Sequence, residues 1–347
     1  MSQSLPPVTL DPEQVNELAR CFWYSAILRA GIKLDVFSRL DAEELTSDQL
    51  AHEVGASSRY IQAFLDSCTV LGLLEKSGDK YRSSALGSRF LVKGKKEYVG
   101  DHALHHTNTW ASWGRLDEVL KEGKPLPPYE TGYVDASTYW TDYMIGQHNR
   151  ATSGQAHHLV EKVDLRTRRR LLDLGGGAAS YSIALCAANP HLAAVVVDQK
   201  EPLGIAGPLV EERGLQDRIT LLEGDFFETD LGNGYDVALI SGVVLITGEK
   251  ECHRLFELAY KVLTPGGMVI VQDYMRVDHN PQRQRLDALE DMYVLVAFDS
   301  GAGDREGEEV ASWLREAGFR DPRMIPLPTQ LALVTAEKPT GPAQEAS

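Results

Sequence analysis

The sequence predicts an α/β fold with a mostly parallel, doubly wound sheet in its C-terminal half, preceded by a smaller helical domain. From residue 170 onward, short runs rich in β-branched and other apolar residues alternate with segments of helical pattern. This alternation is typical of a parallel sheet with helices on both faces. The length of 347 residues also exceeds that of one typical core, so we expect at least two.

The composition favours a globular protein and argues against nucleic acid as a partner. Hydrophobic residues make up 43% of the chain and charged residues 24%, which is close to the globular average. The formal net charge of −15 repels a phosphate backbone. No apolar run is long enough to span a bilayer and the first residues lack a secretory pattern, so we expect a cytoplasmic location and no membrane contact.

The four cysteines match neither a zinc spacing nor a redox spacing. They lie far apart at Cys21, Cys68, Cys186 and Cys252. Widely separated cysteines in a cytoplasmic protein are typically free, and we predict four buried thiols.

The N-terminal domain, expected over residues 1–100, has the pattern of a winged helix. A helical segment over 13–40 is followed by two short helices and then by GLLEKSGDKYRSS, which predicts two strands around a Ser-Gly-Asp turn. The helix caps are predicted at Thr46 or Ser47 and at Ser57 or Ser58, with a break at Gly55. The candidate recognition segment 57–72 holds one arginine and one aspartate, so the domain is expected to pack against protein and not to read DNA.

Residues 101–160 are expected to form a helical linker that contributes to an acceptor pocket. The segment is rich in aromatic residues, including Tyr139, Trp140 and Tyr143, and is interrupted by the proline-rich loop 123–135. Prolines and glycines end regular elements, so the loop separates two helical parts.

The strongest motif of the chain lies at the start of the α/β domain, expected over residues 161–340. A buried strand that includes Asp173 runs into Gly175, Gly176 and Gly177, and a helix begins near Ser180. Glycines at this turn let a ligand approach the main chain and allow dihedral angles that a Cβ disfavours. Alone, the turn also fits a purely structural role.

The next two strands also end in residues suited to a nucleoside. The strand over 193–197 ends in Asp198, and a carboxylate at that strand tip can accept both hydroxyls of a ribose. The third strand leads to Gly224, Asp225 and Phe226, which place a carboxylate beside an aromatic ring. NAD would use a similar carboxylate, but the turn does not match G-x-G-x-x-G and begins at residue 175.

The motifs DLGGG, VVVD, EGDFF, YDVALIS and LTPGGMVIV together resemble those of the S-adenosylmethionine (SAM)-dependent small-molecule O-methyltransferases related to acetylserotonin and plant phenolic methyltransferases. The resemblance implies a Rossmann-like class I methyltransferase domain and a homodimer built through the N-terminal domains. It implies that Asp173 and residues 175–177 line the methionine end of SAM, that Asp198 holds the ribose, and that Asp225 and Phe226 hold the adenine. We expect Gln199, Gly224 and Ser241 in the same cofactor site.

One position departs from this family. Members that methylate phenols usually carry a catalytic histidine after the fourth strand, where this chain has Leu245. Loss of a positioned base costs roughly 10²–10⁴-fold in rate. Three explanations are open: an acceptor that needs no deprotonation, such as a thioether sulfur; a substitute base among His105, His106, His148 or a nearby carboxylate; or another SAM-assisted reaction such as a hydroxylation or a pericyclic step.

We marginally prefer the thioether acceptor, as in a methylthiohydroxybutyrate S-methyltransferase, which would yield a sulfonium. Three rings between Tyr139 and Tyr143 could stabilise the cation, although core packing is the more common role of such rings. The candidate catalytic residues are Tyr143, His148 and Asp273, and Asp273 either binds an acceptor hydroxyl or satisfies a loop. The adjacent histidines at 105–106 and 157–158 diverge by about 100° on a helix, so no metal is predicted.

Three readings of function therefore stay open from the sequence. The first is a methyltransferase directed at sulfur, or at the oxygen of a phenol or hydroxy acid with a substitute base. The second is an enzyme that binds SAM without transferring its methyl group. The third is a SAM-sensing regulator, which would need to bind DNA and which the net charge disfavours.

Overall fold

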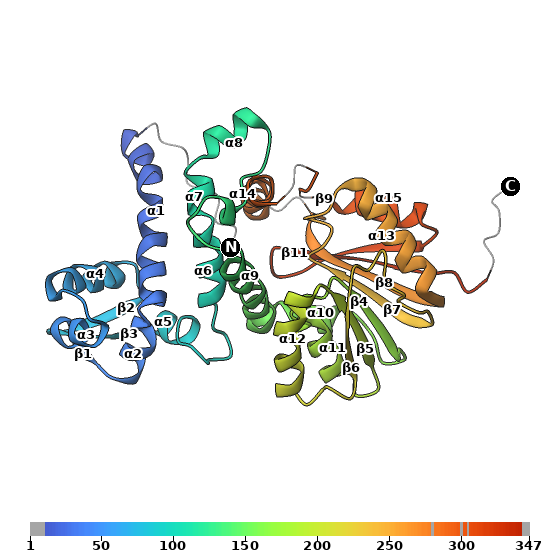
Figure 1. Ribbon diagram of the computed structural model, residues 1–347, viewed down its shortest axis with the longest axis horizontal. Helices are drawn as coiled ribbons and strands as arrows, with labels where there is room; N and C mark the ends of the chain where they lie inside the picture. The colour runs from blue at the N-terminus through green and yellow to red at the C-terminus, as the bar shows by residue number, and fades with distance from the viewer. Residues whose placement is uncertain (1–10, 279–280, 299–300, 304, 342–347) are drawn as a thin grey trace. The chain divides into compact units, whose positions relative to one another are not determined.

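The computed structural model of the chain describes residues 11–278, 281–298, 301–303 and 305–341 (Figure 1). The chain divides into two compact units, residues 1–107 and residues 108–347. The observed division thus lies close to the expected boundary at residue 100. The predicted linker over 101–160 is not a separate body, because its residues from 108 onward pack within the second unit. Residues 1–10 of the expected N-terminal domain lie outside the described residues.

The first unit has the elements of a winged helix. Its helices and strands are α1 (Pro12–Lys33), α2 (Val36–Ala42), β1 (Leu45–Thr46), α3 (Ser47–Val54), α4 (Ser58–Val70), β2 (Leu74–Ser77), β3 (Lys80–Ser83), α5 (Ala85–Phe90) and α6 (Gly100–Asn108). Thr46 caps α3 through a reciprocal pair of hydrogen bonds with Gln49, and Gly55 ends that helix with a φ of 66°. Strands β2 and β3 pair around the predicted Ser-Gly-Asp turn.

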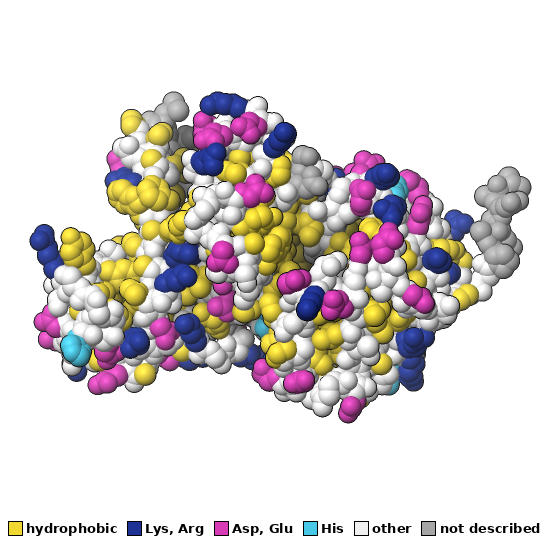
Figure 2. Space-filling view, viewed as in Figure 1, with side chains coloured by type: hydrophobic (Ala, Val, Ile, Leu, Met, Phe, Trp, Pro, Cys, Tyr) yellow, Lys and Arg dark blue, Asp and Glu magenta, His cyan; other side chains and the backbone are white. Residues whose placement is uncertain are grey.

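Helix α1 exposes large apolar side chains along much of its length. Phe22 is 62% exposed and Trp23 is 52% exposed, and Figure 2 shows hydrophobic side chains gathered over this helix. Cys21 is exposed on the same helix, so the prediction of four buried thiols is wrong at this position, while the other three cysteines are buried. The prediction failed because α1 has no partner on this face within its own unit.

The second unit is a doubly wound α/β domain, as the sequence predicts. Before the sheet come α7 (Trp110–Trp113), α8 (Leu116–Glu122), η1 (Pro128–Glu130), α9 (Ala136–Arg150), η2 (Ala151–Gln155) and α10 (Ala156–Lys162). The sheet and its helices are β4 (Arg170–Leu174), α11 (Ser180–Ala188), β5 (Ala193–Asp198), α12 (Lys200–Glu212), β6 (Ile219–Glu223), β7 (Tyr235–Ser241), α13 (Glu249–Val262), β8 (Leu263–Arg276), α14 (Pro281–Ala297), β9 (Arg305–Glu306), α15 (Gly307–Glu316), β10 (Arg320–Pro326) and β11 (Leu331–Glu337).

The strand order is β10-β11-β8-β7-β4-β5-β6, with β9 paired to β8. Strands β8, β7, β4, β5 and β6 run parallel, whereas β10 and β11 are antiparallel to their neighbours. One buried cluster packs α10, α11 and α12 against one face of the sheet, and a second packs α13 and α15 against the other. The carboxyl ends of β4, β5 and β7 therefore meet at one edge, where a doubly wound sheet binds its ligands.

Within the described residues, no helix is both long enough and apolar enough to cross a bilayer.

Candidate active site

The glycine turn after β4 forms the floor of the site. Gly175 and Gly177 have φ angles of 72° and 55°, in the left-handed region that side chains disfavour. A Cβ on Gly175 would lie 2.8 Å from Cγ2 of Val243, and one on Gly176 would lie 2.6 Å from Cγ1 of Val196. Gly175 is thus favoured both by its backbone conformation and by close approach, Gly176 by close approach, and Gly177 by its backbone conformation.

Asp173 lies on β4 just before this turn and is almost completely buried. Its Oδ2 accepts a hydrogen bond of 2.6 Å from the Ser182 hydroxyl. Its Oδ1 has no hydrogen-bond partner among the described residues. Burial raises the pKa of Asp173 to about 7. A buried carboxylate with a free oxygen at the edge of a cavity is suited to accept a cationic donor such as an ammonium group.

Asp198 lies at the end of β5, opposite the glycine turn. Its Oδ2 accepts the N–H of Gly177 at 2.7 Å and its Oδ1 accepts the N–H of Gln199 at 2.7 Å. Burial raises the pKa of this carboxylate, and the two N–H donors oppose that shift. Asp198 lines the cavity, and Gln199 lines an adjoining hollow between α9 and α12.

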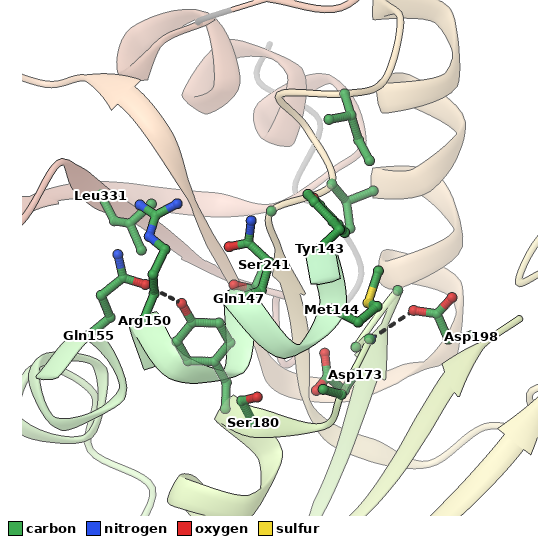
Figure 3. Close-up of a pocket in the computed structure, with 18 of the residues that line it drawn as sticks. Tyr143, Met144, Gln147, Arg150, Gln155, Asp173, Ser180, Asp198, Ser241 and Leu331 are labelled. Atoms are coloured by element: carbon green, nitrogen blue, oxygen red, sulfur yellow. Dashed lines mark hydrogen bonds between the residues drawn. The ribbon is translucent and has the colours of Figure 1, made fainter. Parts of the chain in front are cut away.

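A cavity of about 330 Å³ opens above the glycine turn (Figure 3). Its lining comes from α9, η2, the carboxyl ends of the central strands, and the loop after β7: Trp140, Tyr143, Met144, Gln147, Arg150, Gln155, Asp173, Gly175, Gly176, Gly177, Ala178, Ser180, Tyr181, Asp198, Phe226, Ser241, Gly242, Val243, Ile246, Thr247, Tyr274 and Leu331.

One end of this cavity gathers hydrogen-bond donors around Arg150, the last residue of α9. The guanidinium donates to the Tyr274 hydroxyl and stacks over that ring, with 5.1 Å from the guanidinium carbon to the ring centroid. The Gln155 amide lies 3.1 Å from the guanidinium and 2.9 Å from the Tyr181 hydroxyl. No carboxylate of the described chain lies within ion-pairing distance of Arg150, so this end of the cavity is suited to an anion from a ligand.

The opposite wall is apolar and is formed by the loop after β7. Val243, Ile246 and Thr247 line it, and the Thr247 hydroxyl is occupied by a hydrogen bond to the Val243 carbonyl. The side chain of Leu245 is buried in the core and does not line the cavity. Its N–H donates to Oδ2 of Asp273 at 3.1 Å.

The candidate catalytic residues are not brought together around one point. Tyr143 lines the cavity, and burial raises its pKa to about 12. His148 does not line it: its Nδ1 lies 2.8 Å from the Ser180 hydroxyl, and burial lowers the pKa of the imidazole. Asp273 is completely buried and also lies outside the lining.

Other predicted residues have mixed positions. Phe226 and Ser241 line the cavity, whereas Asp225 is exposed and its carboxylate accepts the N–H of Phe227 at 2.8 Å. Gly224 has a φ of 150°, and its N–H donates to the main-chain oxygen of Asp198. Of the three aromatic residues singled out on α9, Tyr139 is fully buried and does not line the cavity.

His105 and His106 lie on α6 in the first unit, where their rings pack with His102. Among the described residues, no group of three or more histidine, cysteine, aspartate or glutamate side chains is placed to hold a metal ion.

Sequence reasoning missed the polar end of the cavity. Arg150, Gln155 and Tyr181 carry no motif, and each lies on a helix where a polar residue ordinarily faces solvent. The sequence signal that could have found Arg150 is its spacing of seven residues from Tyr143, which places both on one face of a helix.

The fold and site define a class I SAM-dependent methyltransferase, and family models support this. The O-methyltransferase domain matches residues 113–320, and the O-methyltransferase dimerisation domain matches residues 16–93. The chain therefore belongs to the O-methyltransferase family, and its cofactor is S-adenosylmethionine.

Individual relatives align over almost the whole chain. It is 29% identical over 324 residues to the 3-hydroxy-5-methyl-1-naphthoate 3-O-methyltransferase of Streptomyces sahachiroi, covering 92% of this chain and 93% of the relative. It is also 29% identical over 347 residues to the L-tyrosine C(3)-methyltransferase of Streptomyces lavendulae, covering 90% and 89%. The structure of human N-acetylserotonin methyltransferase in complex with SAM matches with a TM-score of 0.84 and 25% identity, covering 98% of this chain and 100% of that one.

Proposed function

We propose that this enzyme methylates a small aromatic acceptor whose reacting atom attacks without help from a protein base. The observation that carries the proposal is the wall formed by Val243, Ile246 and Thr247, which holds no imidazole and no carboxylate. Tyr143 and Tyr181 do line the cavity, but burial raises the pKa of each phenol to about 12. Phenols of that pKa are poor bases at neutral pH.

The residues of the polar end fit the cofactor. The free Oδ1 of Asp173 suits the ammonium group of the methionine moiety, and Arg150 suits its carboxylate. Asp198 suits the ribose hydroxyls, which would compete with the N–H of Gly177 for its Oδ2. When bound, SAM supplies an electrophilic methyl group on a sulfonium. The acceptor's lone pair forms the new bond to the methyl carbon as the sulfur–carbon bond breaks, and S-adenosylhomocysteine leaves.

The walls of the cavity favour a flat acceptor. Trp140 and Tyr143 both line the cavity and meet edge to face, with 5.7 Å between their ring centroids. Such rings pack well against an aromatic acceptor. Without a base on the wall, a hydroxyl acceptor must ionise by itself, which favours phenols made acidic by electron-withdrawing groups.

A thioether sulfur is the second candidate acceptor. It offers a lone pair at any pH, and the faces of Trp140 and Tyr143 could stabilise the resulting sulfonium. Both relatives described above act, by name, on aromatic compounds at oxygen or carbon, which favours the aromatic acceptor over the thioether.

An acceptor screen tests the proposal. Acidic phenols, ordinary phenols, thioethers, amines and carboxylates would each be incubated with enzyme and SAM, and S-adenosylhomocysteine release measured. We expect turnover with acidic phenols and little with phenols of pKa near 10 at pH 7. Turnover by thioethers alone would favour the sulfur reading. Tight SAM binding without release in any arm would support a SAM-binding protein that does not methylate.

We also propose that the enzyme is a homodimer through its first unit. The exposed apolar face of α1 is too large to be left in water, and residues 16–93 match the dimerisation domain. Replacing Phe22 and Trp23 by glutamate should give monomers in analytical ultracentrifugation, whereas Met324→Glu, at an exposed apolar position of the second unit, should not. A wild-type protein that sediments as a monomer at micromolar concentration would contradict this.

A further inference from the structure

Leu245, which the family resemblance places where phenol methyltransferases carry a histidine, makes hydrogen bonds through both its N–H and its carbonyl group. Its N–H donates to Oδ2 of Asp273 at 3.1 Å, and its carbonyl oxygen accepts the N–H of Gly303 at 2.9 Å. Its side chain is only 7% exposed and belongs to the same buried cluster as Tyr274 and Ala302. Residue 245 therefore anchors the loop and presents nothing to the cavity.

Both carboxylate oxygens of Asp273 accept hydrogen bonds from the main chain. It is 0% exposed, and its Oδ1 accepts the N–H of Tyr274 at 2.9 Å while its Oδ2 accepts that of Leu245. The N–H groups of Val243 and Val244 also stabilise its ionised form. Its hydrogen bonds thus come from main-chain donors, and the charge of Arg305 adds a weaker favourable interaction with the buried carboxylate.

The loop that Asp273 holds sets the width of the cavity. Val243 approaches Gly175 so closely that a Cβ on that glycine would lie 2.8 Å from its Cγ2. A further bond holds the far end of the loop, where Arg305 donates to the Thr247 carbonyl at 3.0 Å. A small movement of residues 243–247 would therefore change the space between the apolar wall and the glycine turn.

We propose that Asp273 is a positioning residue for methyl transfer, whose ionised carboxylate fixes the main chain of residues 243–247 and so holds the apolar wall against the glycine turn. This inference rests on the proposed function only in assigning the cavity to SAM and its acceptor. It replaces the earlier expectation that Asp273 is catalytic, because its carboxylate touches main-chain donors and not the cavity.

Amide hydrogen exchange on the ligand-free protein tests this directly. Asp273→Asn keeps the shape of the side chain, but its NH₂ group cannot accept a hydrogen bond. We expect exchange within residues 243–247 to accelerate about tenfold or more, because a buried charge-assisted hydrogen bond is lost. The matched control is Asp236→Asn, since Asp236 accepts the N–H groups of Arg169 and Arg170 at 2.6 and 2.9 Å at the opposite end of the sheet. The control should leave residues 243–247 unchanged.

A pH comparison separates positioning by charge from simple packing. Burial raises the pKa of Asp273 to about 7. The groups that interact with it are the guanidinium of Arg305 and three groups whose pKa values are raised to about 12 and which stay neutral, Tyr143, Tyr181 and Cys252. In wild-type protein, exchange in 243–247, corrected for its intrinsic pH dependence, should therefore rise between pH 8 and pH 6. In Asp273→Asn it should be fast at both.

S-adenosylhomocysteine affinity gives the functional readout. We expect Asp273→Asn to bind it about tenfold more weakly at pH 8 and Asp236→Asn to bind it as wild type does. Unchanged local exchange in Asp273→Asn, or acceleration spread evenly over the whole sheet in both variants, would overturn the positioning role. Failure of the wild-type protein to bind S-adenosylhomocysteine would overturn the proposed function instead and leave the exchange result to decide the role of Asp273.

Discussion

The two sides of the cavity differ in how they handle charge. One side carries Asp173, Asp198 and Arg150, which all line the cavity. Behind the wall after β7, Asp273 is also a buried carboxylate, but it accepts hydrogen bonds from the main chain. This wall therefore presents only apolar and hydroxyl groups to the cavity. The comparison teaches that a buried carboxylate can keep an oxygen without a hydrogen bond on one side of the cavity and hold the main chain on the other.

The largest effect on SAM affinity is expected at Gly175, where the glycine turn approaches the wall after β7. Gly175→Ala should lower SAM affinity on the order of 100-fold, because the new Cβ would overlap Val243. Calorimetry measures the affinity. Gly214→Ala is the control, since Gly214 has a similar φ of 63° but open space around its Cα. Binding of SAM by Gly175→Ala with the affinity of Gly214→Ala would contradict the close approach of Val243 to the glycine turn.

A smaller effect on SAM affinity is expected at Arg150, in the polar end of the cavity. Arg150→Gln should weaken SAM binding about 10- to 100-fold through loss of a charge-assisted hydrogen bond. Decarboxylated SAM, which lacks the carboxylate, should bind wild type and variant with similar affinity. Arg166→Gln, which removes an exposed arginine paired with Asp164, should change neither. If the variant lost affinity for both ligands equally, Arg150 would be holding the fold of the cavity or the acceptor instead.

Asp173 should show opposite effects on binding and stability. Asp173→Asn is expected to weaken SAM binding about tenfold at pH 8. Because the folded-state pKa is raised from 3.8 to about 7, the ionised carboxylate destabilises the ligand-free fold at pH 8, and its removal should stabilise that fold by up to about 4 kcal/mol. The fold is favoured by the protonated carboxyl of Asp173, and this stabilisation is lost as the pH rises from 4 to 7. Thermal unfolding at pH 5 and pH 8 checks the sign, and a gain confined to pH 5 would contradict it.

The smallest effect, on the rate of methyl transfer, is expected at His148. Its imidazole contacts Ser180 and does not line the cavity, so His148→Gln should change the methyl-transfer rate by less than about threefold. Single-turnover measurements with saturating SAM provide the rate. A loss of 100-fold or more would make His148 the substitute base and remove the contrast between the two sides.

The glycine turn and the strand-end carboxylates were largely predictable from the sequence, and the loop after β7 and the surroundings of Arg150 were not. Glycines and strand-end carboxylates have a fixed spacing from β-strands, so the turn at 175–177 and Asp198 could be placed from residue pattern alone. Leu245 was recognised as a departure, but its burial could not be foreseen, because it depends on Gly303 and Asp273 meeting the same loop from distant parts of the chain. Arg150 was missed for a similar reason, since its neighbours Gln155, Tyr181 and Tyr274 converge only in the fold.

The helical unit shows a related limit. Its winged-helix elements follow from local caps and turns: Thr46 is one of the two caps predicted for α3, and Gly55 ends that helix as predicted. The exposure of Cys21 and Phe22 was harder to predict, because an apolar helix face in one sequence gives the same pattern whether it packs in the core or stays exposed.

The central claim, that no protein base acts on the acceptor, is tested most directly by the pH dependence of methyl transfer across a series of phenols of graded acidity. Single-turnover rates would be measured from pH 6 to pH 10 with saturating SAM. The account predicts that the rate rises with unit slope and levels off at a pH that shifts with the pKa of each phenol. A plateau at one fixed pH for every acceptor, lost on replacing a single side chain, would identify a protein base and contradict the account.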